Sequence, residues 1–327
     1  MVKQTTALPD AVVTVVTYNS AADIEVCVRS LAAHFPLLAA GRAQVHVVDN
    51  ASTDNTPAIM QRLSQEFGWL TVHLLSKNLG FGPGNNLVLN SLAAKAFVLL
   101  NADAWLVADS FSPALEHLSN SPNTGVIGLP LVYPDGAPQT YAFLPSAWHR
   151  WLMLLLGFRD IAKTLMGFAP IKALMQCIPF SRNFLTNHGK PPLDLDDSRS
   201  LATAATGEVN SVDWVAGAAM VLSPDFLHQS GGFDPKIFLY GEDEDLCIQA
   251  KNLGFRVETL QTTPIVHKLG WGSGAGFQPR VAYMKYNSLR YFIAKNVKTQ
   301  FNRAVMSALL PFYVYGSNLG HFFRGDN

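Results

Sequence analysis

The densest run of potentially reactive side chains is a row of four consecutive acids at residues 242–245, within FLYGEDEDLC. Adjacent carboxylates repel one another, so burying any of them raises a pKa or requires a cation. An acidic first helical turn is the alternative, because negative charge stabilises a helix N-terminus. Aromatic residues before the row and apolar residues after it favour a partly enclosed cluster. We therefore treat this row as a candidate site.

Two more polar residues stand beside strand-like apolar runs. Asp103 follows FVLLNA, and His267 ends PIVH. At the ligand edge of a sheet, such an aspartate can hold a divalent cation by oxygen ligation. An isolated aspartate after a strand is often only a turn residue, and an isolated histidine is more often structural. The presence of two acidic sites together with His267 favours metal binding.

Two loops contain polar or glycine residues that suit contact with a ligand. Asp49 ends a strand-like run and can accept hydrogen bonds from a base or ribose, whereas Ser52 and Asp54 can cap the following helix. In NLGFGPGNN (78–86), three glycines allow backbone amides to approach a ligand closely, and a flexible turn is the alternative. The segment matches neither the GxGxxG nor the Walker pattern, so dinucleotide and P-loop chemistry are not indicated.

Alternating strands and helices are expected to position these loops. The first half predicts strands at 12–17, 44–48, 70–75 and 96–100, and helices at 22–33, 53–67 and 85–94. This alternation predicts a parallel, doubly wound α/β sheet, in which ligands bind at the carboxyl ends of the strands. Farther along we expect a strand at 126–132, a polar loop at 190–206, regular structure at 209–222, a helix at 243–253 and a helical, aromatic C-terminus.

The composition excludes some classes of protein. Lys+Arg and Asp+Glu balance at 24 each, which argues against a nucleic-acid partner. Three scattered cysteines, no signal-peptide run and no stretch of about 18 apolar residues predict a cytoplasmic protein. The segment 147–184 combines apolar and basic residues with one acid, Asp160. It is expected either to lie in a membrane interface or cover an acceptor site, or to be a helical insertion packed on the core.

Taken together and in order, the motifs resemble those of inverting family 2 glycosyltransferases with the GT-A fold, in particular the bacterial rhamnosyltransferase-like branch. They are TYN, VDNASTD, NLGFGPGNN, LLNADA, WVAGAAMVL, GGFDPKIFLYGEDEDLC and IVH. The resemblance covers about 11–275, apart from an insertion at about 147–206. It implies a Rossmann-like, mostly parallel sheet flanked by helices in a GT-A domain at 1–275, with that helical insertion, and a C-terminal helical extension at 276–327.

The resemblance also implies roles for single residues. Asp243 matches the general base, and Asp103 and His267 match ligands of Mg²⁺ or Mn²⁺. Asn101 occupies the first position of the family's DXD motif, a departure that this branch commonly shows. Of the other acids, Glu242 and Asp245 are expected to hold substrate or helix, and Glu244 to face solvent. The expected nucleotide- and sugar-binding residues are Thr17, Asn19, Asp49, Asn78, Gly80, Asn85, Asn101, Trp214, Gly217 and Glu242.

The implied activity is metal-dependent transfer of a sugar to a hydroxyl of a glycan or lipid-linked acceptor in surface-polysaccharide or lipopolysaccharide synthesis. The implied donor is dTDP-L-rhamnose, with UDP-galactofuranose or another UDP-hexose as alternatives. Peripheral contact with the inner face of the plasma membrane is expected through 147–184 and the C-terminal helices.

Two alternatives belong to other classes. A non-catalytic nucleotide-sugar-binding protein would explain Asn101, but Asp103, Asp243 and His267 together argue against it. A nucleotidyltransferase would need a glycine-rich loop with a basic residue after the first strand, where this chain has TYNS.

Overall fold

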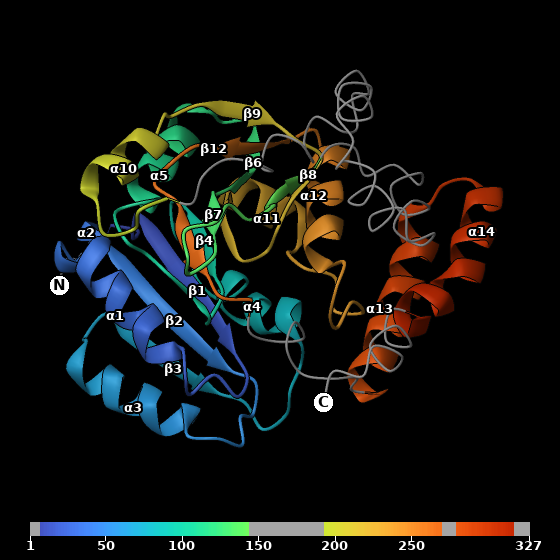
Figure 1. Ribbon diagram of the computed structural model, residues 1–327, viewed down its shortest axis with the longest axis horizontal. Coiled ribbons are helices and arrows are strands. Elements are labelled where there is room, and N and C mark those ends of the chain that lie inside the picture. Colours follow the sequence, from blue (N-terminus) through green and yellow to red (C-terminus); the bar gives the residue numbers. More distant parts are fainter. Residues whose placement is uncertain (1–6, 144–192, 270–278, 317–327) are drawn as a thin grey trace, which may run out of the picture.

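The computed structural model describes residues 7–143, 193–269 and 279–316 (Figure 1). The apolar, basic segment predicted at 147–184 lies outside the described residues. None of the helices in the described ranges combines the length and hydropathy needed to span a bilayer.

An eight-stranded sheet forms the centre of the molecule, in the order β3-β2-β1-β4-β11-β6-β12-β9. The pairs β1–β2, β1–β4, β2–β3 and β6–β12 are parallel, whereas β11 is antiparallel to β4 and β6, and β9 to β12. The predicted α/β fold with a mostly parallel sheet is confirmed, and the two antiparallel strands are additions to it. The strands are β1 (Ala11–Thr17), β2 (Ala43–Asp49), β3 (Leu70–Leu74), β4 (Phe97–Leu100), β6 (Thr124–Gly128), β9 (Val209–Ser211), β11 (Ala219–Leu222) and β12 (Arg256–Leu260).

Helices cover both faces of this sheet (Figure 1). Strand β1 is buried on both sides, with Val13 and Val15 in one apolar cluster and Val12 in the other, as its run of β-branched residues predicts. The first cluster includes side chains of α1 (Ile24–His34), α2 (Pro36–Ala39), α3 (Thr56–Glu66) and α5 (Phe111–Asn120). The second includes side chains of α4 (Phe81–Leu89), α11 (Pro224–Ser230) and α12 (Glu242–Asn252).

Two smaller sheets stand beside the main one. One has the order β5-β13-β7, from β5 (Ala104–Trp105), β13 (Ile265–His267) and β7 (Leu131–Val132). The other pairs β8 (Ala142–Phe143) with β10 (Trp214–Val215). The single strand predicted at 126–132 is therefore broken at Pro130, which has no N–H for a strand ladder. The regular structure predicted at 209–222 consists of the three short strands β9, β10 and β11. Part of the predicted polar loop at 190–206 is a helix, α10 (Ser198–Ala204), capped by the Asp197 carboxylate.

The C-terminal described residues form a helical hairpin beside the second helical layer (Figure 1, red). It consists of α13 (Pro279–Asn296), α14 (Gln300–Pro311) and a π-helical turn, η1 (Phe312–Gly316). A third apolar cluster holds the hairpin together and includes Leu289, Phe292, Met306 and Leu310, with Ile237 from the segment before α12.

Candidate active site

Backbone strain marks the carboxyl edge of the sheet. In the described part of the chain, four non-glycine residues have a left-handed φ: Asn19 (53°), Ala51 (61°), Tyr240 (70°) and Leu269 (58°). Asn19 and Ala51 follow β1 and β2, Leu269 follows β13, and Tyr240 precedes α12. Such conformations cost of order 1–3 kcal/mol and cluster at functional sites. Their positions coincide with the loops that the sequence singled out.

The loops after β1 and β2 are linked by hydrogen bonds around Asp49. Its buried carboxylate accepts from the backbone N–H of Ser52 at 2.9 Å and from the Ser52 hydroxyl. Ser52 Oγ also accepts from the backbone N–H of Asn19 at 2.8 Å. Ser52 thus joins the two loops. The sequence alone predicts that it caps the next helix. Asp54 does accept a hydrogen bond from the first turn of α3, through Thr56 N at 3.0 Å.

At the end of β1, Thr17 contributes a polar atom that the described residues leave unsatisfied. Its side chain is 2% exposed, and its Oγ1 has no hydrogen-bond partner in the described part of the chain. Buried polar groups are usually hydrogen-bonded, so an exception at this edge of the sheet suits a ligand contact.

The glycine-rich loop is shaped by asparagine side chains. Asn50 accepts from Leu79 N and donates to Gly80 O, both at 3.1 Å, and Asn78 Oδ1 accepts from Gly80 N at 2.9 Å. Gly80 has φ of 94°, and a Cβ there would lie 2.5 Å from the Phe238 carbonyl oxygen. The loop is thereby held against the segment that leads into the acidic row, and only glycine fits at this point.

The helix after this loop begins at Phe81, four residues earlier than predicted. Gly84 explains the difference, since a Cβ there would lie 3.0 Å from Val16 Cγ1, and its absence allows the helix to approach β1. Asn85 is consequently 1% exposed, donates to Phe81 O at 3.0 Å and accepts from Thr14 Oγ1 at 3.2 Å. The Asn85 amide thus joins the helix to the sheet, and its expected place near the nucleotide pocket stays a prediction.

Asn101, Asp103 and His267 meet where β4 turns into β5. Asp103 Oδ1 lies 3.4 Å from His267 Nε2, and Asn101 Nδ2 lies 3.3 Å from the same nitrogen. Pairing of β13 with β5 places His267 opposite Ala104, the residue after Asp103. The sheet β5-β13-β7 therefore brings together two residues that are 164 positions apart in sequence.

Gln139 completes this group, although no feature of the sequence indicated it. Its Oε1 lies 3.0 Å from His267 Nδ1, and its Nε2 donates to the His267 carbonyl at 2.5 Å. A glutamine oxygen accepts, so His267 carries a proton on Nδ1, and its Nε2 faces both Asp103 and Asn101. Gln139 is 4% exposed. Its position in the sequence, three residues after a Pro-Asp-Gly turn, gives no sign of this burial, which depends on the fold.

Asp243 lies next to this group. Its Oδ2 accepts from Gly217 N at 3.2 Å, and its Oδ1 accepts from Glu244 N at 2.8 Å. Ala218 follows Gly217 in the chain, and its carbonyl oxygen accepts a hydrogen bond from Asn101 N at 2.9 Å. The segment 217–218 thus borders both the acidic row and the Asp103–His267 pair. Trp214, on the same segment, is half-buried and stacks on Phe143 at a centroid distance of 3.8 Å.

The remaining acids of the row occupy different environments. Burial, and then the charge of Asp243, raise the pKa of Glu242, whose Oε2 is buried without a hydrogen-bond partner among the described residues. Asp245 is fully buried and accepts from Lys295 Nζ and Asn296 Nδ2, both at 2.8 Å. The expectation that Glu244 faces solvent is wrong: it is 3% exposed, in a helix that packs against β10, β12 and α13.

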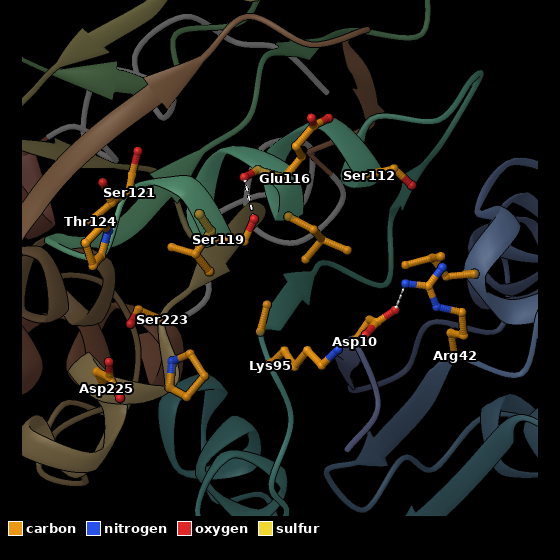
Figure 2. A pocket seen from close by; sticks show the side chains of 16 residues that line it. Asp10, Arg42, Lys95, Ser112, Glu116, Ser119, Ser121, Thr124, Ser223 and Asp225 are labelled. Atoms are coloured by element: carbon orange, nitrogen blue, oxygen red, sulfur yellow. Dashed lines mark hydrogen bonds and ion pairs between the residues drawn. The ribbon is translucent and has the colours of Figure 1, made fainter. Parts of the chain in front are cut away.

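A second depression lies at the opposite edge of the sheet. This cavity of about 660 Å³ is lined by residues that precede β1, β2 and β4. Figure 2 shows Asp10 there between Lys95 and Arg42, and both cations pair with it. The hydrogen bond from Lys95 is the main cause that lowers the pKa of Asp10. Ligands of open α/β sheets bind at the carboxyl ends of the strands, so we assign no site to this cavity.

Comparison with known proteins agrees with the resemblance. Residues 12–177, just over half of the chain, match the family model described as glycosyl transferase family 2. Two curated relatives, the N-acetylglucosaminyl-diphospho-decaprenol L-rhamnosyltransferases of Mycobacterium tuberculosis strains CDC 1551 / Oshkosh and ATCC 25618 / H37Rv, are each 25% identical over 277 residues. The aligned region covers 80% of this chain and 77% of each relative.

Solved structures share the fold. The mannosyltransferase PcManGT from Pyrobaculum calidifontis, in complex with GDP-Man and Mn²⁺, has a TM-score of 0.55 at 17% identity, over 98% of this chain and 77% of that one. S. aureus TarS 1-349 in complex with UDP has a TM-score of 0.51 at 18% identity, over 94% and 72%. The family match, the rhamnosyltransferase relatives and this shared GT-A fold lead to one conclusion: the chain belongs to glycosyl transferase family 2 and is a glycosyltransferase.

Proposed function

We propose that the chain is an inverting, metal-dependent enzyme that moves L-rhamnose from dTDP-L-rhamnose to a hydroxyl of a lipid-linked or surface-glycan acceptor. The observation that carries this proposal is the distance of 3.4 Å between Asp103 Oδ1 and His267 Nε2. The Asp243 carboxylate lies at the same edge of the sheet, where it accepts a hydrogen bond from Gly217 N. A candidate cation site beside a candidate base suits inverting transfer.

The Asp103–His267 pair fits a divalent cation. Mg²⁺ holds octahedral ligands at about 2.0–2.1 Å, which places neighbouring ligands about 3 Å apart, near the observed 3.4 Å. Gln139 Oε1 fixes the ring by accepting from Nδ1–H, and Nε2 of the neutral ring and the Asp103 carboxylate would then be available together as metal ligands. Within the described ranges, no three or more His, Cys, Asp or Glu side chains group around such an ion. Donor phosphates and water would supply the other ligands.

In this proposal Asp243 takes the proton of the acceptor hydroxyl as that oxygen attacks the anomeric carbon of the donor sugar. Hydrogen bonds from Gly217 N and Glu244 N fix its carboxylate. Glu242, whose raised pKa favours the neutral acid, spares Asp243 a neighbouring negative charge. A bound Mg²⁺ or Mn²⁺ would offset the charge that develops on the leaving diphosphate. Fixed positions for both substrates would supply much of the remaining acceleration.

The proposed donor pocket uses the linked loops at the carboxyl edge. Thr17, Asn19 and Asp49 would contact the base and ribose, and Asn78 and Gly80 would lie beside the nucleotide. Trp214 and Gly217 would face the donor sugar and the acceptor. The choice of rhamnose and of a lipid-linked acceptor draws on the names of the mycobacterial relatives.

The test is release of nucleoside diphosphate from a panel of donors: dTDP-L-rhamnose, UDP-galactofuranose, UDP-glucose, UDP-N-acetylglucosamine and GDP-mannose. We expect slow hydrolysis of dTDP-L-rhamnose that requires Mn²⁺ or Mg²⁺ and stops with EDTA. Hydrolysis of another donor would correct the sugar and leave the enzyme class intact. If the protein binds none of these nucleotide sugars, the proposed donor site and the proposed function are both contradicted.

Gln139 provides a second test of the proposed metal site. Replacing it with leucine should weaken Mn²⁺ binding about 10–100-fold, because His267 loses the partner that fixes its ring and tautomer. Electron paramagnetic resonance of free Mn²⁺, titrated with protein and dTDP, measures this affinity without turnover. Gln139→Glu keeps an acceptor for Nδ1–H but replaces the donor to the His267 carbonyl by a second oxygen, so it should recover only part of the affinity. Equal Mn²⁺ affinity in the wild type and the leucine variant would show that Gln139 does not contribute to the metal site.

A further inference from the structure

The outer face of α14 is apolar where a surface helix is normally polar. Phe301, Ala304 and Ala308 of α14, with Phe312 at the start of η1, are here called the outer stripe; they recur every three or four residues and are all exposed. Phe301 is 75% exposed and Phe312 71%, the largest exposed fractions among the large apolar side chains of the described residues. The outer stripe therefore forms one continuous surface along the helix.

The opposite face of α14 already supplies the packing that holds the helix in place. Met306 and Leu310 are 1% and 0% exposed and belong to the apolar cluster shared with α13. A globular helix needs one apolar face against the core and carries polar residues on the other. The folded hairpin does not account for the outer stripe, which points to a second apolar environment.

Charge around the outer stripe is of one sign. The chain as a whole is neutral, yet residues 279–316 contain no Asp or Glu and six basic residues: Arg280, Lys285, Arg290, Lys295, Lys298 and Arg303. Lys295 is used inside the fold, where it pairs with Asp234 and Asp245. Lys285 lies over the rings of Tyr240 and Tyr313, each at 4.8 Å. Arg280, Arg290, Lys298 and Arg303 are exposed.

We propose that the outer stripe of α14, with the basic side chains of the hairpin, docks on the surface of an anionic lipid bilayer. An interfacial helix buries aromatic side chains at the acyl boundary while Lys and Arg contact anionic headgroups. A second copy of the hairpin is a poorer occupant, since two surfaces that lack acids repel each other. This inference rests on the proposed lipid-linked acceptor and adds to it the surface through which the enzyme reaches that acceptor.

Co-sedimentation of the full chain with vesicles tests this surface. Wild type should bind vesicles of phosphatidylcholine with 30% phosphatidylglycerol, bind pure phosphatidylcholine weakly, and lose affinity as salt rises. Phe301→Ser combined with Phe312→Ser should lower the partition coefficient about tenfold or more. Val26→Ser is the matched control, since Val26 is 49% exposed on a helix of the other layer. Arg290→Gln with Lys298→Gln should reduce binding to anionic vesicles only.

Several outcomes would overturn the docking surface. One is wild-type protein that ignores anionic vesicles at low salt, and another is a double-serine variant that binds as wild type does. A dimer that the double-serine variant converts to monomer, seen by light scattering, would assign the outer stripe to self-association. Donor hydrolysis without vesicles is measured on every variant. A variant that keeps donor hydrolysis but no longer binds vesicles supports the docking surface. Wild-type protein that does not hydrolyse the donor contradicts the proposed function, and the vesicle result is then judged separately.

Discussion

Asp243→Asn is expected to lower kcat by roughly 10²–10⁴-fold, because the amide cannot accept the proton of the acceptor hydroxyl. Donor affinity should change little. Both carboxylate oxygens accept from backbone N–H groups, of Gly217 and Glu244, so one of these contacts must face the new NH₂ group. We therefore also expect a stability loss of about 1 kcal/mol. Transfer rates at saturating donor, calorimetric donor affinity and thermal unfolding measure the three effects separately.

Asp225→Asn is a matched control, because Asp225 is an exposed acid in the first turn of another helix, α11. It should leave transfer unchanged. An Asp243→Asn enzyme that keeps a third or more of wild-type kcat would rule Asp243 out as the base. In that case Glu242 would be the next residue to test.

Asp103→Ala is expected to remove most Mn²⁺ binding and to lower transfer by about 10²-fold or more, since it takes away the oxygen ligand of the proposed pair. His267 is a less clean target, because loss of its ring would leave the buried Gln139 Oε1 without the Nδ1 partner. Electron paramagnetic resonance of free Mn²⁺, titrated with protein in the presence of dTDP, measures binding of the ion directly. Glu116→Gln, an exposed acid on α5, should behave as wild type in both assays. Full activity of Asp103→Ala in EDTA would contradict metal dependence.

Much of the fold was predictable from short-range pattern. The apolar runs at β1, β2 and β4 correspond to buried strands, and the loops after them carry most of the candidate residues. The start of α4 was misplaced because glycine and proline usually end regular structure. Gly84 here allows close packing on Val16, and Pro83 is tolerated in a first turn.

Long-range packing decided what the sequence could not. Whether β11 runs antiparallel depends on the connection that precedes it, which a local pattern does not contain. Glu244 was expected to face solvent from its charge alone, and its burial comes from elements up to fifty residues away. Gln139 and His267 are 128 positions apart, and their contact exists only once β13 pairs with β7.

The first turn of α12 has a mechanical consequence. Asp243 faces the segment 217–218, and two residues later Asp245 is held by Lys295 and Asn296 at the end of α13. One helical turn is thus shared between the candidate base and the contact with the hairpin. With the hairpin resting on a bilayer, this turn sets a fixed height of Asp243 above the lipid. The acceptors best served would be those whose reactive hydroxyl stands at that height, so the enzyme would gauge the distance from lipid to sugar.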